Sequence, residues 1–242
     1  MKKTLVVCSG GLDSVTLAYQ VAAERQLQGL LTFDYGQRHK KEIEFAALAA
    51  KRLGVVHRIV DIANLGALLS SSLTDSQQAV PEGHYAADNM AATVVPNRNA
   101  IMLTIAFGLA DSSGADAVGI AVHGGDHFIY PDCRPAFITA FAKMQALALG
   151  KTPAIELFAP YLHLSKGDIA KQSQRFKVPI HETWSCYQGG EQHCGRCGTC
   201  VERLEAVHFA GAADSTDYAD RDFWRRAVAV AKPSAGQGDL HV

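Results

Sequence analysis

Residues 9–14, a Ser-Gly-Gly-Leu-Asp-Ser run, constrain the fold of this chain more than any other stretch. They follow an apolar run at residues 4–8 and open a segment, 15–22, whose apolar residues recur with helical spacing. This pattern predicts a turn that leads from a buried strand into a helix. Gly10 and Gly11 let backbone N–H groups approach an anion, and the helix N-terminus adds its positive dipole end. The stretch therefore predicts a phosphate-binding turn.

The polar side chains of this turn suit a nucleotide that carries a metal ion. Serine hydroxyls can donate to phosphate oxygens, and an aspartate can hold Mg²⁺ against them. The run lacks the lysine of the common P-loop and the spacing of dinucleotide-binding loops. It resembles the PP-loop of the N-type ATP pyrophosphatases, which implies cleavage of ATP between its α- and β-phosphates. The predicted ATP contacts are Cys8, Ser9, Gly10, Gly11, Leu12, Asp13 and Ser14.

Composition limits the classes of protein to consider. The chain has 242 residues, is 48% hydrophobic and carries a formal net charge of −1, which suits one large α/β domain with or without an appended lobe. It has no run of Lys and Arg, so we expect no stable nucleic-acid partner. The N-terminal apolar run is too short for a signal peptide, and no stretch approaches a membrane span. We therefore expect a cytoplasmic protein with no membrane partner.

Strand and helix patterns alternate along most of the chain. This alternation predicts a doubly wound α/β fold of the Rossmann-like kind, with a mostly parallel five-stranded sheet. We expect an ATP-binding domain at residues 1–180, a zinc-binding helical lobe at 181–232 and a flexible tail at 233–242. The further predicted strands are 29–34, 57–62, 116–122 and 155–158, and the further predicted helices are 40–53, 100–110, 135–149, 165–176, 200–209 and 218–231.

Polar loops follow the predicted strands at residues 34–39 and 123–134. Because ligands of such sheets bind at the carboxyl ends of the strands, both loops are expected near the turn at 9–14. Arg38 is a candidate ligand contact, although a solvated loop residue is an equal alternative. Arg98, near the start of the helix at 100–110, can bind an anion bidentately. Residues 63–95 contain few secondary-structure signals, and such a long loop is often a functional lid.

Four of the six cysteines fall within fifteen residues in a C-x₇-C-x₂-C-x₂-C pattern. Four thiolates without an open position are typical of a structural zinc site, so we expect one zinc ion. The adjacent His193 is an alternative ligand, and an iron–sulfur cluster is an alternative occupant. The predicted ligands are Cys186, Cys194, Cys197 and Cys200.

Together these motifs resemble the 7-cyano-7-deazaguanine synthases of queuosine precursor biosynthesis. The resemblance covers about residues 3–210 and rests on the runs at 9–14, 34–39, 95–99 and 130–134 and on the cysteine cluster. The sequence departs from the family pattern at two places. It reads His123-Gly124-Gly125-Asp126-His127 where the family has asparagine, alanine and aspartate, and it has Asn97 where a small residue is more usual.

The resemblance implies an adenine nucleotide α-hydrolase-like fold and an ATP-dependent ligase, active as a homodimer. This enzyme would convert 7-carboxy-7-deazaguanine and ammonia to the nitrile through two adenylations, with release of AMP and pyrophosphate. The implied catalytic residues are Asp13, Arg98 and Lys166, and the implied substrate-binding residues are Arg38, Asp132 and Arg134. The alternatives are another PP-loop enzyme, such as a tRNA thiolation enzyme, and a zinc-binding module without catalysis.

Overall fold

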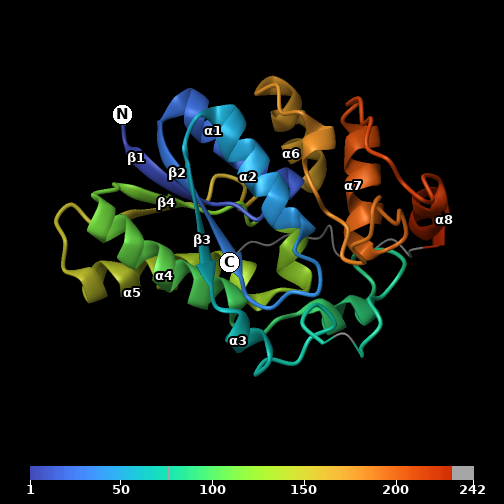
Figure 1. Cartoon of the computed structure of the whole chain (residues 1–242), viewed down its shortest axis with the longest axis horizontal. Helices are drawn as coiled ribbons and strands as arrows, with labels where there is room; N and C mark the ends of the chain where they lie inside the picture. The colour runs from blue at the N-terminus through green and yellow to red at the C-terminus, as the bar shows by residue number, and fades with distance from the viewer. Residues whose placement is uncertain (76, 231–242) are drawn as a thin grey trace.

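The computed structural model describes residues 1–75 and 77–230 (Figure 1). Its centre is a five-stranded sheet with the strand order β3-β2-β1-β4-β5. Every neighbouring pair of strands is parallel, as predicted. The strands are β1 (Lys3–Val7), β2 (Gln26–Asp34), β3 (Val56–Asp61), β4 (Ala117–Gly119) and β5 (Glu156–Phe158).

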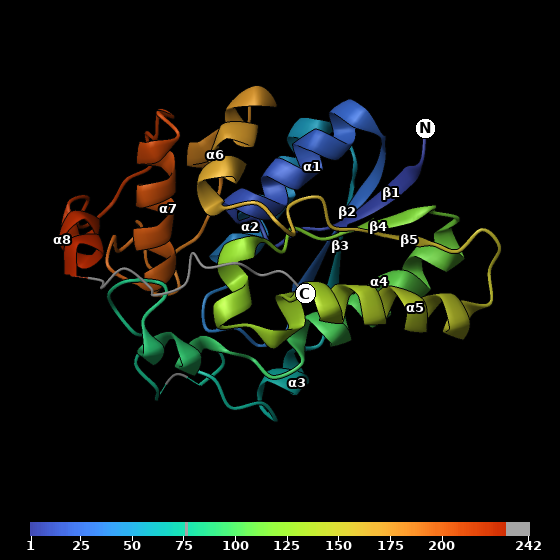
Figure 2. The ribbon, with the colours of Figure 1, turned by 180° about the vertical axis from the view of Figure 1, so that it is seen from behind.

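Helices cover both faces of the sheet, so the fold is doubly wound as the sequence predicts (Figures 1 and 2). One core contains Val15, Leu17 and Ala46, and it joins the sheet to α1, α2 and α6. The other core contains Phe107 and Phe141, and it joins the sheet to α4 and α5. The bounds are α1 (Leu12–Glu24), α2 (Lys41–Leu53), α4 (Arg98–Ser113), α5 (Pro135–Leu149) and α6 (Lys166–Arg175).

Apolar content on both faces of the strands explains this architecture. Val6 and Leu30 are fully buried on the side of α1 and α2, whereas Leu5 and Leu31 are buried on the side of α4 and α5. A parallel sheet whose strands are apolar on both faces requires a helical layer on each. Within the described residues, no helix is long and apolar enough to cross a membrane.

The C-terminal part of the chain adds α7 (Gly198–Phe209) and α8 (Phe223–Val230) beyond α6 (Figures 1 and 2). The prediction that the last helix begins near residue 218 is wrong. Tyr218 forms a β-bridge with His193, and the side chain of Asp220 accepts the backbone N–H of Phe223, where the helix begins. The end predicted for this helix and the predicted tail lie outside the described residues.

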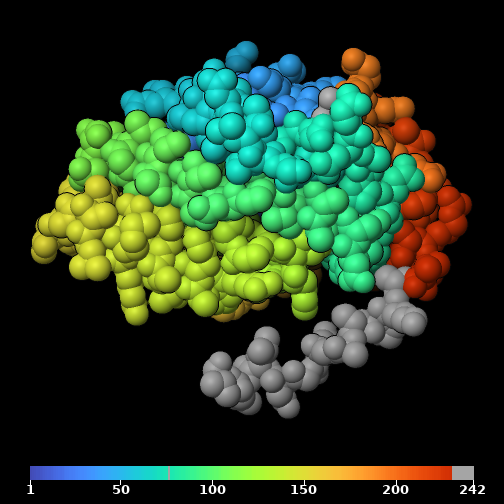
Figure 3. Space-filling model, turned by 90° about the horizontal axis from the view of Figure 1, so that it is seen from below, coloured from blue at the N-terminus to red at the C-terminus, as the bar shows by residue number. Residues whose placement is uncertain are grey.

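The segment at 63–95 contains α3 (Ala63–Gly66) and a short 3₁₀ helix, Asp88–Thr93, rather than a bare loop. Leu73, Val80 and Met90 are buried, so the segment packs against the body of the protein. Its second half contacts the cysteine-rich region, because the backbone N–H of Gly83 donates to the carbonyl of Arg196 at 3.0 Å. Figure 3 shows the segment as a cyan-to-teal band across one face of the molecule.

Candidate functional site

A cavity of about 250 Å³ lies at the carboxyl edge of the sheet. Its wall includes the turn between β1 and α1, the start of α4, the loop after β4 and the first turn of α7. These segments are far apart in the sequence, and the parallel topology brings the loops after the strands to one edge. This edge is where ligands are expected in a doubly wound fold.

The turn at residues 9–14 has the conformation of an anion cradle. Gly10 has φ +92°, and a Cβ atom there would lie 2.0 Å from the carbonyl oxygen of Glu42, so only glycine fits. The backbone N–H of Ser9 donates to Ser14 Oγ at 3.1 Å, which fixes the loop over the first turn of α1. Gly11 is the N-cap of α1, and no side-chain hydrogen bond caps this helix end. Its first N–H groups therefore remain available to an anion.

Asp13 and Lys166 form the central charged pair of the cavity. Lys166 Nζ lies 2.5 Å from Asp13 Oδ2 and 3.5 Å from Glu202 Oε2, and all three side chains are largely buried. Burial alone would raise the pKa of Asp13, but the Lys166 ammonium beside it outweighs burial and lowers it. The pKa of Lys166 is raised because the two carboxylates outweigh its burial. Both side chains are therefore charged at neutral pH.

The two carboxylate oxygens of Asp13 differ. Oδ2 contacts the lysine, whereas Oδ1 is buried and has no hydrogen-bond partner within the described part of the chain. An uncompensated buried carboxylate oxygen is costly unless a ligand completes it. Asp13 Oδ1 is therefore a fitting ligand for a divalent cation at the phosphate end of the cavity.

Glu202 is a site residue that the sequence analysis missed. It lies on α7, two residues after Cys200, and its side chain reaches the same cavity as Asp13. A single glutamate within a helical pattern gives no sequence signal that it belongs to the cavity. The cysteine pattern fixes the start of α7, but only packing of that helix beside α6 turns Glu202 toward Lys166.

The other end of the cavity is aromatic and contains Arg98. The guanidinium lies 5.6 Å from the centre of the Tyr35 ring and donates to Tyr35 Oη at 3.4 Å. Tyr130 and Tyr187 line the same end. Among residues 1–75 and 77–230, no carboxylate lies within 4.0 Å of this half-buried guanidinium, and the Glu42 carboxyl interacts with it only from a longer distance. Such a group is suited to a ligand anion.

Three of the six residues predicted for catalysis or substrate binding, Arg38, Asp132 and Arg134, do not line this cavity. Arg38 donates to the carbonyls of Ser72 and Gln78 and so holds the 63–95 segment. These contacts give Arg38 a structural role, and its role in substrate binding stays a prediction.

Asp132 and Arg134 also have partners within the protein. Asp132 Oδ2 accepts the backbone N–H of Asn99 at 2.8 Å and thereby caps the start of α4. Arg134 Nε donates to the carbonyl of His127 at 2.9 Å. Their proposed contacts with the deazaguanine ring and its carboxylate stay predictions.

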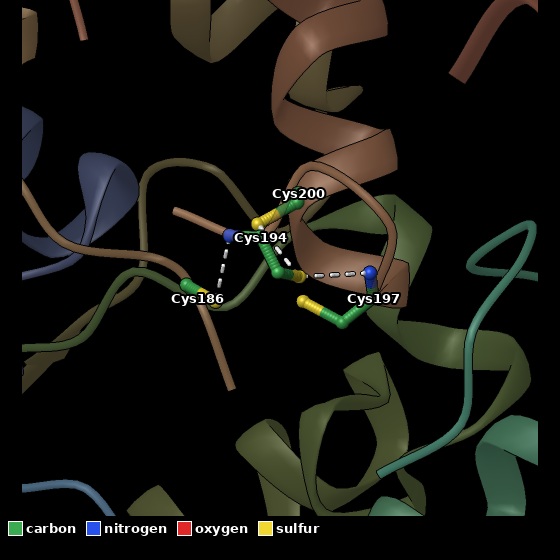
Figure 4. A group of neighbouring side chains, drawn as sticks. All are labelled: Cys186, Cys194, Cys197 and Cys200. Carbon is green, nitrogen blue, oxygen red and sulfur yellow. Dashed lines mark hydrogen bonds between the residues drawn. The ribbon is translucent and has the colours of Figure 1, made fainter. Parts of the chain in front are cut away.

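The four cysteines converge on one point (Figure 4). Their Sγ atoms all lie within 4.8 Å of one another, and Cys194 Sγ is 3.9 Å from Cys200 Sγ. A tetrahedral zinc ion with Zn–S bonds of about 2.3 Å places its sulfurs about 3.8 Å apart. Backbone N–H groups of Arg196 and Cys197 donate to Cys194 Sγ at 3.3 Å, as expected for a thiolate. The donor set therefore fits a tetrahedral metal ion.

His193, the alternative metal ligand, does not join this group. Its Nε2 lies 3.1 Å from the backbone nitrogen of Ser185, whose N–H it accepts, and its ring packs against Trp184. Burial lowers the pKa of His193 to about 3, so the imidazole is neutral. The ring thus helps to support the cysteine loop from the side.

The metal centre and the cavity are joined by α7. Cys197 is the N-cap of this helix, and Cys200 lies in its first turn. Gly198, Thr199 and Glu202, which lie between and after these ligands, line the cavity. A metal ion bound by the four cysteines would therefore fix the wall of the cavity that carries Glu202.

A doubly wound sheet with a glycine turn, a buried Asp–Lys pair and a cavity at its carboxyl edge defines an α/β protein with an anion site of the nucleotide-binding kind. Comparison with known families agrees with this class. The family model described as queuosine biosynthesis protein QueC matches residues 3–211. This match covers most of the chain, and the chain belongs to the QueC family.

Close relatives support the assignment. The 7-cyano-7-deazaguanine synthase of Rhizobium rhizogenes is 64% identical over 222 residues, which cover 92% of this chain and 94% of the relative. The enzyme of the same name from Brucella ovis is 61% identical over 223 residues, which cover 92% and 96%. Among solved structures, the U34-tRNA thiolase NcsA from Methanococcus maripaludis aligns with a TM-score of 0.46 at 13% identity, over 99% of this chain and 77% of that chain. That likeness is too low to carry an argument.

Proposed function

We propose that this chain is an ATP-dependent ligase that converts 7-carboxy-7-deazaguanine and ammonia to 7-cyano-7-deazaguanine. The observation that carries the proposal is its 61–64% identity, over more than nine-tenths of the chain, to enzymes of that name. The charged pair in the cavity supports it independently, because adenylation by ATP requires stabilised phosphate charge.

The reaction needs the same carbon to be activated twice. The substrate carboxylate attacks the α-phosphate of ATP, and pyrophosphate leaves. Ammonia then displaces AMP to give the amide. The amide oxygen is adenylated by a second ATP, and loss of AMP leaves the nitrile. A carboxylate or amide oxygen leaves poorly and AMP leaves well, so the protein mainly positions reactants and neutralises charge.

Each part of the turn has a proposed role in this scheme. Backbone N–H groups of Gly10 and Gly11 and the hydroxyls of Ser9 and Ser14 bind the departing pyrophosphate. Asp13 Oδ1 holds Mg²⁺, which neutralises phosphate charge when bound. Lys166, kept charged by its carboxylate neighbours, stabilises the negative charge on the pentacoordinate α-phosphorus group in the transition state.

Arg98 is proposed to bind the adenylate or the substrate carboxylate at the aromatic end of the cavity. No carboxylate in the described part of the chain pairs directly with it, which supports this role, since a half-buried guanidinium gains most from a ligand anion. The tyrosines around it offer flat apolar surfaces against which a purine-like ring can stack.

The proposal for the cysteine site is one structural zinc ion per chain, because four sulfur ligands leave no open position for substrate. The proposed place of action is the cytoplasm, where ATP is available and thiols stay reduced. The resemblance extends the proposal to a homodimer, which light scattering of the purified protein would test.

One incubation tests the proposed reaction. We expect the protein with ATP, Mg²⁺, ammonium and 7-carboxy-7-deazaguanine to form AMP, pyrophosphate and the nitrile, with two ATP consumed per nitrile. The variant Lys166→Met should slow turnover by about 10²- to 10³-fold, the usual loss for one transition-state donor. Formation of ADP, or turnover that requires RNA rather than the deazaguanine, would contradict the proposal.

A further inference from the structure

The loop after β4 builds a polar cluster opposite the Asp13–Lys166 pair. His123 Nε2 lies 3.9 Å from Asp13 Oδ2, 3.7 Å from Asp126 Oδ2 and 4.0 Å from Glu202 Oε1. The imidazole is almost completely buried, with 2% of the side chain exposed. Three carboxylates thus surround one ring nitrogen, and the Lys166 ammonium contacts two of them, Asp13 and Glu202.

The backbone fixes which ring nitrogen of His123 carries the proton. The N–H of Gly125 donates to His123 Nδ1 at 3.1 Å, so Nδ1 is an acceptor. The proton of the neutral ring therefore resides on Nε2. A Cβ atom at position 125 would lie 2.9 Å from the imidazole and 3.1 Å from Glu202 Oε1, so glycine is needed for this approach.

His123 Nε2–H has no hydrogen-bond acceptor within the described residues, because all three carboxylates lie beyond hydrogen-bond distance. A buried N–H donor that faces a cavity and has no acceptor in the protein is expected to bind a ligand atom. This ligand needs a lone pair to accept from Nε2–H and N–H or O–H groups to donate to the carboxylates. A metal ion fails the first requirement, because it offers no lone pair.

We propose that His123, Asp126 and Glu202 form the binding site of the ammonia nucleophile. This inference rests on the proposed function, because ammonia is the third substrate of that reaction. Ammonia has one lone pair and three N–H groups, which match one N–H donor and several carboxylate acceptors. The surplus of carboxylates attracts ammonium from solvent, and its fourth proton returns to solvent as neutral ammonia binds to His123 Nε2–H.

Glu202 places the cluster at the boundary of a second cavity. Lys166 and Glu202 line this second cavity of about 280 Å³, together with Tyr85 and Glu205. His123 and Asp126 line only the first cavity, where the adenylated substrate would lie. The proposed ammonia site is therefore part of the first cavity, with Glu202 at the boundary between the two.

The test separates binding of ammonia from adenylation. In the full-length protein, ATP–pyrophosphate exchange with 7-carboxy-7-deazaguanine reports adenylation without ammonia, and nitrile formation at varied ammonium reports the KM for ammonium. We expect Asp126→Asn and His123→Leu to raise the KM for ammonium at least about 10-fold, the loss of one hydrogen bond to a charged group. The exchange rate and the KM for ATP should stay within about twofold, since neither contact involves them. Asp111→Asn, on the exposed side of α4, is the control.

Two outcomes would overturn the inference. An unchanged KM for ammonium in both variants would show that these residues do not bind ammonia. A collapse of exchange in both variants would show that the cluster serves the nucleotide or its metal. Exchange activity in each variant also shows that it has folded. Failure of the proposed function is distinct, because the wild-type protein would then show neither exchange nor nitrile.

Discussion

Single carboxylates in this cavity differ in charge because their neighbours differ. Asp13 lies against the Lys166 ammonium, which outweighs burial and lowers the pKa of Asp13. Glu42 lines the same cavity and accepts a hydrogen bond from the amide of Gln37 at 3.2 Å, and Arg98 acts on it from a longer distance. Burial outweighs the Arg98 charge and this hydrogen bond, and it raises the pKa of Glu42 to about 7. The same residue class thus supplies one permanent anion and one group that titrates near neutrality.

Glu42 gives the protein a stability that depends on pH. Because its pKa is raised on folding, the native state binds more protons than the unfolded state between about pH 4.5 and about pH 7. The stability that the neutral form contributes is present below this window and is lost as pH rises through it. We expect Glu42→Gln to gain stability relative to wild type as pH rises from about 5 to about 8.

Urea unfolding at both pH values measures the gain from Glu42→Gln. Glu44→Gln on the same helix is the matched control, since Glu44 is exposed to water in the native state. A stability difference between Glu42→Gln and wild type that stays constant across the window would show that burial does not control this group.

At the scale of elements, the turn between β1 and α1 depends on one glycine. Gly10→Ala would force a side chain into the left-handed region and against the carbonyl of Glu42 on α2. We expect the variant to lose several kcal/mol of unfolding free energy, more than the ~1–2 kcal/mol cost of the left-handed conformation alone. It should also lose ATP–pyrophosphate exchange.

Gly54→Ala is the control for Gly10→Ala. Gly54 also has a positive φ, +67°, but no atom lies within 4 Å of the position that a Cβ would take. Thermal unfolding of both variants separates the conformational cost from the clash. Equal losses in the two variants would show that contact with α2 has no energetic weight.

The metal centre and α7 form the second decisive element. Cys194→Ser should abolish binding of one zinc ion per chain and loosen the start of α7, because Cys197 and Cys200 belong to that helix. Elemental analysis measures the metal, and hydrogen exchange measures the backbone around Gly198 and Glu202. The turnover rate should fall together with the protection of these backbone amides from hydrogen exchange. Iron bound in place of zinc, or an ordered α7 without any metal, would contradict the assignment.

At the scale of the whole molecule, Arg203 joins the C-terminal helices to the body. Its side chain is fully buried on α7 and donates to Thr183, to the carbonyl of Ile180 and to Thr216. Asp214 lies 3.8 Å from its Nε and supplies the opposite charge. One guanidinium thus connects α7 to the segments at residues 180–183 and 214–216.

We expect Arg203→Met to destabilise the protein by about 3–5 kcal/mol, because it leaves Asp214 buried without its partner. Thermal or urea unfolding measures the loss. Arg175→Met is the control, since the Arg175 side chain is 65% exposed and its ion pair with Glu24 is worth at most about 1 kcal/mol. If Arg203→Met lost as little unfolding free energy as Arg175→Met, the part of the protein with α7 and α8 would be held mainly by the metal and by apolar packing.

The sequence by itself determined the local features of this protein. Residues 9–14 predicted a strand, a turn and a helix because glycine spacing and apolar periodicity act over a few residues. The alternation of strands and helices predicted the parallel sheet, since short crossovers leave few other topologies. The cysteine spacing predicted the metal ligands because a C-x₂-C step brings two thiolates together within one turn.

Only the tertiary structure decided which distant side chains share the cavity. Glu202 meets Lys166 because α7 packs beside α6, and His123 on the loop after β4 lies near Glu202 and Asp13; no local pattern encodes these distances. Tertiary contacts also engage Arg38 and Asp132 with backbone groups of distant segments, and neither residue lines the cavity. Local propensity acts between neighbours in the chain, whereas the chemistry of the site depends on contacts between residues that lie from tens of positions to more than a hundred positions apart.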